Sequence, residues 1–150
     1  MALGQQIDRE LVVALKAGDR TKVATLRLVK AAAKNAEVEK RDSLSDSEYL
    51  DVIQRQVKLR HEAATEYDRA GRQESAEQEH AEMRVLETYL PEQLSDAEIR
   101  SILEEVIQEA SATGPSDLGK VMQRAMPALK GKADGARVNQ MARNLLLRPH

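Results

Sequence analysis

The sequence predicts an all-α protein, with an N-terminal helical subdomain of about four helices followed by a three-helix tail subdomain. Ala, Glu, Lys, Leu and Arg make up 77 of the 150 residues, a share that is typical of long helices. The chain has no Phe, no Trp and only three Tyr. This composition argues against sandwiches and barrels, which draw on aromatic and β-branched residues. Apolar residues also recur at helical spacing between clear start and stop signals.

Three of the expected N-terminal helices have legible ends. Apolar residues at helical spacing over 3–15 predict the first, and Gly18 follows as a left-handed stop. Asp19 can cap the second helix. Residues 45–48 read Ser-Asp-Ser-Glu, a capping box in which the serine hydroxyl accepts an unpaired backbone N–H while the glutamate reaches back. This box begins a third helix that we expect to end at Gly71.

A fourth apolar pattern runs from residue 76 to residue 90 and predicts the last helix of the N-terminal subdomain. Its middle, residues 77–82, is almost wholly polar, so we expect it at the surface. Pro91 is the sharpest break in the chain, because it removes a backbone donor and forces the preceding residue out of the α region. We therefore expect a boundary between subdomains 1–90 and 91–150.

The pattern of the tail subdomain predicts three helices. A second capping box, Ser-Asp-Ala-Glu at 95–98, begins the first helix, and the Gly-Pro pair at 114–115 ends it. A serine or aspartate at 116–117 can cap the second helix, which Pro127 is expected to disturb. The turn before the third helix carries Gly131, Asp134 and Gly135.

The net charge of −2 conceals a strong local asymmetry. Residues 91–112 hold six acidic residues and one basic residue, whereas residues 113–150 hold seven basic and two acidic residues. The basic segment can pair with the acidic helix inside the fold, or it can face an anionic partner. The sequence leaves both possibilities open.

Composition also excludes several classes of function. Because the chain has no cysteine, disulfides, thiolate metal sites and cysteine nucleophiles are excluded. With three aromatic rings, a platform for stacking nucleobases is not expected. The apolar run at 11–15 is far shorter than the roughly 20 residues of a membrane span, and no secretory signal is visible. We expect a cytoplasmic protein with no membrane partner.

Three patterns that resemble catalytic or ligand-binding motifs are better explained as ordinary structural features. Residues 114–120 fit the first seven places of a phosphate-binding loop, but Val121 stands where magnesium needs a hydroxyl, so a helix start is preferred. The histidines lack metal-ligand spacing, and we interpret His61, His80 and His150 as surface residues. The acidic residues between 74 and 82 are interpreted as a solvated helix face. We expect no catalytic residue, no metal and no cofactor.

The segment 131–135, Gly-Lys-Ala-Asp-Gly, has two interpretations. As an ordinary turn, Gly131 ends one helix and Asp134 caps the next. Alternatively, basic side chains surround the exposed N–H groups at a helix start, which suits a phosphate. The side chains in question belong to Lys130, Lys132 and Arg137. The residues alone favour the turn.

Several stretches of the chain resemble the YqeY-like family, and together they cover almost its whole length. They are residues 25–32, 58–60, 89–98, 119–122 and 126–135. The chain departs from the family pattern at two positions. Gln123 stands where glycine is common and Ala142 where valine is usual, so both affect helix packing and neither removes a charged group. The resemblance implies an all-helical fold whose tail is similar to the C-terminal domain of the GatB-type component of the glutamine-dependent aminoacyl-tRNA amidotransferases. In those enzymes, this domain is implicated in gripping tRNA.

The resemblance and the basic tail together suggest a helical module that binds tRNA or a complex of the tRNA-amidotransferase type. Phosphate contacts would come from Lys120, Lys130, Lys132 and Arg137, and close backbone approach from Gly131 and Gly135. Two alternatives stay open. One is an accessory component of a carbon–nitrogen ligase with glutamine as amido-N-donor. The other is an adaptor that binds a protein partner.

Overall fold

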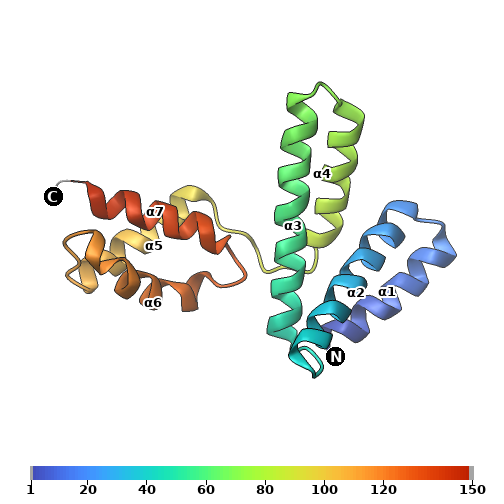
Figure 1. Ribbon diagram of the computed structural model, residues 1–150, viewed down its shortest axis with the longest axis horizontal. Coiled ribbons are helices and arrows are strands. Elements are labelled where there is room, and N and C mark those ends of the chain that lie inside the picture. The colour runs from blue at the N-terminus through green and yellow to red at the C-terminus, as the bar shows by residue number, and fades with distance from the viewer. Residues whose placement is uncertain (1, 149–150) are drawn as a thin grey trace. The chain divides into compact units, whose positions relative to one another are not determined.

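The computed structural model describes residues 2–148 (Figure 1). Over these residues the chain is all-α, with no strand. It divides into two compact units between Leu90 and Pro91. No helix in the described range has the length and apolar character needed to cross a membrane.

The first unit consists of two helical hairpins (Figure 1). In the first hairpin, α1 (Leu3–Ala17) packs against α2 (Arg20–Lys40). In the second, α3 (Asp46–Arg69) lies along α4 (Gln73–Glu87). Their shared core holds Ile7, Leu11, Leu26, Val29, Ala33, Tyr49, Ile53 and Leu86.

The expected start and stop signals act as predicted in this unit. Gly18 and Gly71 adopt left-handed φ angles of 71° and 72° after α1 and α3. The carboxylate of Asp19 accepts a hydrogen bond from Lys22 N at 3.1 Å. The capping box of Ser45 and Glu48 is complete in both directions. These ends depend on interactions over three or four residues, so the local sequence determines them.

A buried ion pair connects the two helices of the second hairpin. The guanidinium of Arg60 donates hydrogen bonds to the backbone and side chain of Gln56, and its Nε lies 3.3 Å from Glu82 Oε2. The neighbouring Glu79 is half-buried, and its pKa is raised by desolvation and by the charge of Glu82. The interpretation of residues 74–82 as a solvated face is therefore wrong for Glu79 and Glu82, because α3 covers them.

The second unit is a three-helix bundle made of α5 (Asp96–Glu109), α6 (Leu118–Leu129) and α7 (Gly135–Leu147). A short 3₁₀ turn, η1 (Pro115–Asp117), precedes α6. The core is entirely aliphatic apart from sulfur-bearing residues at its edge. Its buried members are Ile99, Leu103, Ile107, Ala112, Val121, Ala125, Leu129, Ala133, Val138, Ala142, Leu145 and Leu146.

Three helix ends in this unit differ from the sequence prediction. Helix α5 ends at Glu109, before the Gly-Pro pair at 114–115 that was expected to end it, and Ser111 takes the left-handed φ of 52° that turns the chain away. Helix α6 continues through Pro127 to Leu129, so the expected disturbance does not end it. The missing N–H of Pro127 falls in the last turn of α6, with little helix left to disrupt. The carboxylate of Asp117 accepts a hydrogen bond from Thr113 N at 2.9 Å and makes no capping bond to α6.

Candidate nucleic-acid interface

A tight turn joins α6 to the segment before α7, and it presents two lysines. Lys130 has φ −59° and ψ 128°, and Gly131 has φ 79°. Lys132 N donates to Leu129 O at 2.9 Å. These values define a type II turn, which requires a positive φ at its third residue and so favours glycine there. We call residues 129–132 the basic turn.

The basic turn is anchored to the segment that begins the second unit. The amide of Gln93 donates from Nε2 to Gly131 O and to Pro91 O, both at 2.8 Å. Leu94 N donates to Lys132 O at 2.9 Å. These bonds hold the turn by its backbone and leave its lysine side chains free to face solvent.

Lys130 and Lys132 are exposed on this anchored turn. Across residues 2–148, neither lysine has an ion-pair partner. Because the two lysines are two residues apart on a constrained backbone, one short turn presents both positive charges. Such a pair attracts a phosphate backbone through charge and through hydrogen-bond donation.

Gly131 and Gly135 have different structural roles. Gly131 is buried, and its positive φ already explains why a glycine stands there. A Cβ on Gly131 would lie 3.7 Å from Pro91 Cγ, which is an ordinary contact. Gly135 is the first residue of α7, and a Cβ there would meet open space. Packing therefore requires glycine at neither position, and backbone conformation requires it only at Gly131.

The start of α7 is already occupied by a carboxylate. Asp134 caps the helix by accepting a hydrogen bond from Ala136 N at 3.3 Å. The interpretation of Asp134 as the N-cap, and of Gly131 as the residue that ends α6, is confirmed. An acidic cap satisfies the helix dipole, so a phosphate gains less at this helix start than at an uncapped one.

Arg137 forms an ion pair within the unit. Its guanidinium donates from Nε to Asp96 Oδ1 at 2.7 Å and from Nη2 to Asp96 Oδ2. The pairing lowers the pKa of Asp96 and raises the pKa of Arg137, in each case mainly through the shared side-chain hydrogen bonds. Of the two possibilities left open for the basic segment, internal pairing with the acidic helix therefore applies to this residue.

Lys120 lies away from the basic turn. It is the third residue of α6, so about 15 Å of helix separates it from Lys130. Its Nζ donates to Ala110 O at 2.9 Å, just beyond the last residue of α5. A cation at that position complements the carboxyl end of the α5 dipole. The structure thus places Lys130 and Lys132 on one turn and leaves Lys120 at the other end of α6.

The segment 114–120, His61 and His80, which the sequence does not predict to be binding sites, lie in helices and turns of the fold. The segment 114–120 forms the 3₁₀ turn and the first residues of α6. His61 is exposed and His80 is half-buried, whereas His150 lies outside the described residues. Between residues 2 and 148, no group of three or more His, Asp or Glu side chains is arranged to hold a metal ion.

The chain is similar to a mitochondrial protein and to part of an amidotransferase. A protein named altered inheritance of mitochondria protein 41, mitochondrial, from Pyrenophora tritici-repentis, is 27% identical over 130 residues, which is 85% of this chain and 71% of that protein. A glutamyl-tRNA(Gln) amidotransferase subunit from Thermococcus sibiricus is 43% identical over 54 residues. That match covers 33% of this chain but only 9% of the amidotransferase chain, most of which therefore has no counterpart here.

The match to a protein family spans nearly the whole chain. Residues 4–146 match the family described as Yqey-like protein, which takes in both helical units. The all-α fold and the partial likeness to an amidotransferase agree with that match. The chain therefore belongs to the YqeY-like family.

Proposed function

We propose that the second unit binds the phosphate backbone of tRNA through the basic turn. The observation that carries the proposal is the pair of exposed lysines, Lys130 and Lys132, without an ion-pair partner in the described range and on a turn that one backbone hydrogen bond closes and two more anchor. A backbone held in place loses little conformational freedom when a ligand binds. The 43% identity to part of a glutamyl-tRNA(Gln) amidotransferase supports tRNA as the anion.

The remaining predicted residues contribute unequally in this proposal. Lys120 adds a phosphate contact at the far end of α6, and Arg137 adds one only to the extent that a phosphate competes with Asp96. Gly131 supports the site by forming the turn. Because residues 91–150 contain no Phe, Tyr or Trp, recognition depends on RNA shape and phosphate position.

The experiment measures the binding of a fluorescently labelled tRNA(Gln) transcript to the full chain at low salt. We expect binding, and we expect Lys130→Ala/Lys132→Ala to weaken it at least about tenfold, since each phosphate contact contributes roughly additively to affinity. The matched control, Lys16→Ala/Lys34→Ala, removes the same charge from exposed positions of the first unit and should bind like the natural chain. Equal loss in both double variants, or no binding at low salt, would refute the proposal.

A second candidate is an accessory role in a carbon–nitrogen ligase that takes nitrogen from glutamine. The observation that favours it is the same partial match to an amidotransferase chain, of which this protein covers 9%. We expect no amidation of glutamyl-tRNA(Gln) by the purified chain with glutamine and ATP. Turnover by the chain alone, abolished by a single substitution in it, would instead establish an enzyme.

A further inference from the structure

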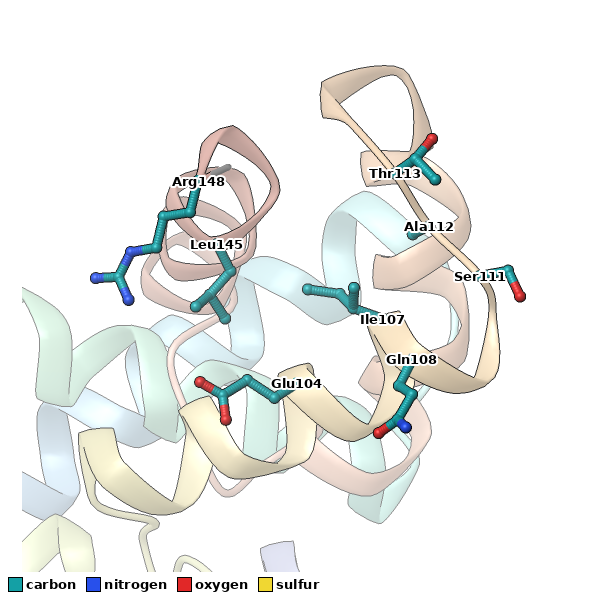
Figure 2. Close-up of a pocket in the computed structure, with 8 residues that line it drawn as sticks. All are labelled: Glu104, Ile107, Gln108, Ser111, Ala112, Thr113, Leu145 and Arg148. Carbon is teal, nitrogen blue, oxygen red and sulfur yellow. The ribbon is translucent and has the colours of Figure 1, made fainter. Parts of the chain in front are cut away.

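A groove opens between the carboxyl ends of α5 and α7, in the second unit (Figure 2). Its volume is about 570 Å³, which lies in the range of ligand-binding cavities. Ile107 from α5 and Leu145 from α7 both line it (Figure 2). Both belong to the core of the bundle, so the groove is a place where the aliphatic core reaches the surface.

The course of the chain explains why this end of the bundle is open. Helices α5 and α7 are tied at their first turns by the Asp96–Arg137 ion pair. After α5, Ser111 adopts a left-handed φ of 52°, and Ala112 N donates back to Ile107 O at 3.0 Å. This arrangement is the hydrogen-bond pattern of a Schellman motif, which turns the chain sharply away from the helix axis.

The two walls of the groove carry opposite charges. Glu104 projects from α5 and Arg148 from the end of α7, and both are exposed (Figure 2). In the described part of the chain, no ion pair joins Glu104 to Arg148 or to another residue. An occupant that complements both walls must present a basic group on one side and an acidic group on the other.

These properties fit a protein segment better than RNA. The walls offer Ile107, Leu145 and no aromatic ring on which a nucleobase could stack. The carboxylate of Glu104 would repel a phosphate. Leu145 in the groove also lies about 12 Å along α7 from Arg137, so the groove is separate from the basic turn.

We propose that this groove docks an amphipathic helix of a protein partner. The helix would place aliphatic side chains against Ile107 and Leu145, a basic side chain beside Glu104 and an acidic side chain beside Arg148. Such a helix in a groove is a recurrent mode of peptide recognition, with anchors spaced at i, i+3, i+4 and i+7. The same unit would then hold RNA at one end and a protein at the other.

The test uses three helical peptides of about 16 residues, long enough to be measurably helical in isolation. All share the same leucine stripe, and their flanks are lysine on one side and glutamate on the other, lysine on both, or glutamate on both. We expect the mixed-charge peptide to bind the full chain about two- to fivefold more tightly than either of the others. Turning a peptide end for end exchanges its two flanks. The mixed-charge peptide therefore matches both walls in one of its two directions, whereas the other two peptides match both walls in neither.

Charge-reversal variants make the ranking diagnostic. Glu104→Lys makes both walls basic and should make the all-glutamate peptide the tightest binder. Arg148→Glu makes both walls acidic and should favour the all-lysine peptide. The control variants Glu105→Lys and Arg143→Glu change exposed residues on the same helices outside the groove, and the mixed-charge peptide should remain the best binder for both.

Methyl NMR of the full chain locates the binding. The methyl signals of Ile107 and Leu145 should shift with peptide, while those of Leu26 and Leu86 in the first unit should not. The proposal is overturned if no peptide shifts the groove signals, or if the control variants reorder the peptides as Glu104→Lys and Arg148→Glu do. It is also overturned if tRNA(Gln) shifts the groove signals and the peptides do not.

Discussion

Arg137 and Asp96, 41 residues apart in the sequence, join the first turns of α7 and α5 through two parallel hydrogen bonds. Their side chains are 53% and 54% exposed, so water and competing anions reach both partners. Exposed pairs of this kind contribute little to stability. The main consequence of the pair is electrostatic, because the negative charge of Asp96 offsets the positive charge of Arg137, five residues after the basic turn.

Removing that carboxylate should strengthen RNA binding. Asp96→Asn frees the charge of Arg137, so we expect tighter tRNA binding and a salt dependence whose slope rises by about 0.7 to 0.9, the contribution of one more phosphate contact. Glu92→Gln removes the same charge from another exposed acidic residue, four positions before Asp96. This variant should leave the slope of the salt dependence unchanged. The slope is obtained from affinities measured at several salt concentrations, and equal slopes for the two variants would exclude a role for Arg137.

The basic turn should depend on the glycine at 131. Because Gly131 has φ 79°, Gly131→Ala forces a side chain into the left-handed region and should lower the free energy of unfolding by about 1 to 2 kcal/mol. Gly135→Ala places the same methyl group in open space on a helical residue. It should leave stability unchanged or slightly higher. Urea unfolding followed by circular dichroism distinguishes the two, and a loss at Gly135 as large as at Gly131 would contradict this role for Gly131.

The ion pair within the second hairpin predicts a strong difference between two arginines. Arg60→Met leaves Glu82, whose side chain is only 14% exposed, without its partner, so we expect a loss of about 3 kcal/mol in the free energy of unfolding. Arg69→Met removes an arginine that pairs with Glu66 at the surface, where both side chains are over 70% exposed, and should change stability little. The free energy of unfolding is measured by chemical denaturation. Similar losses in the two variants would show that the Arg60–Glu82 pair stabilises the fold no more than the surface pair does.

The sequence predicts most helix ends because they depend on neighbouring residues. The two capping boxes and the stops at Gly18, Gly71 and Gly131 are all local, and the structure has a helix end at each. Contacts between distant residues are different. The pairing of Arg137 with Asp96 and of Arg60 with Glu82 requires the tertiary packing that aligns two helices, and periodicity carries no information about which charges then meet.

The same difference explains how the predicted site residues are distributed. Lys130 and Lys132 are close in sequence, so their proximity could be inferred directly. The distance of Lys120 from the basic turn follows from the direction of α6, and the anchoring by Gln93 follows from tertiary packing. Of the three consecutive leucines at the end of α7, Leu145 and Leu146 enter the core while Leu147 is 64% exposed, and only the packing of the bundle decides which of them is buried.

Glu48, in the first capping box, has a carboxyl group with an unusually low pKa. The pKa of Glu48 is lowered from 4.5 to about 2, first by its hydrogen bond with Lys40 and then by the bonds with Ser45. Because its folded pKa is depressed, the stability it supplies is present above pH 4.5 and is lost as the pH falls toward 2. Lys40→Met should raise this pKa only part of the way to 4.5, since the Ser45 bonds remain.

A pH titration followed by NMR of the side-chain carboxyl carbons measures this directly. Glu98, in the second capping box, is an internal reference, because its pKa is lowered by Ser95 without a lysine. Lys40→Met should leave the titration of Glu98 unchanged. If the titration of Glu48 were also unchanged, the ion pair with Lys40 would not be the main cause of the shift.

The most direct test of the central claim is the salt dependence of tRNA(Gln) binding by the natural chain and by Lys130→Ala/Lys132→Ala. With contacts from Lys120, Lys130 and Lys132, and with Arg137 held by Asp96, the logarithm of the affinity should fall against the logarithm of salt with a slope of about 2.5. The double variant should lose about 1.5 from that slope, because two phosphate contacts disappear. An unchanged slope in the double variant would contradict RNA binding at the basic turn.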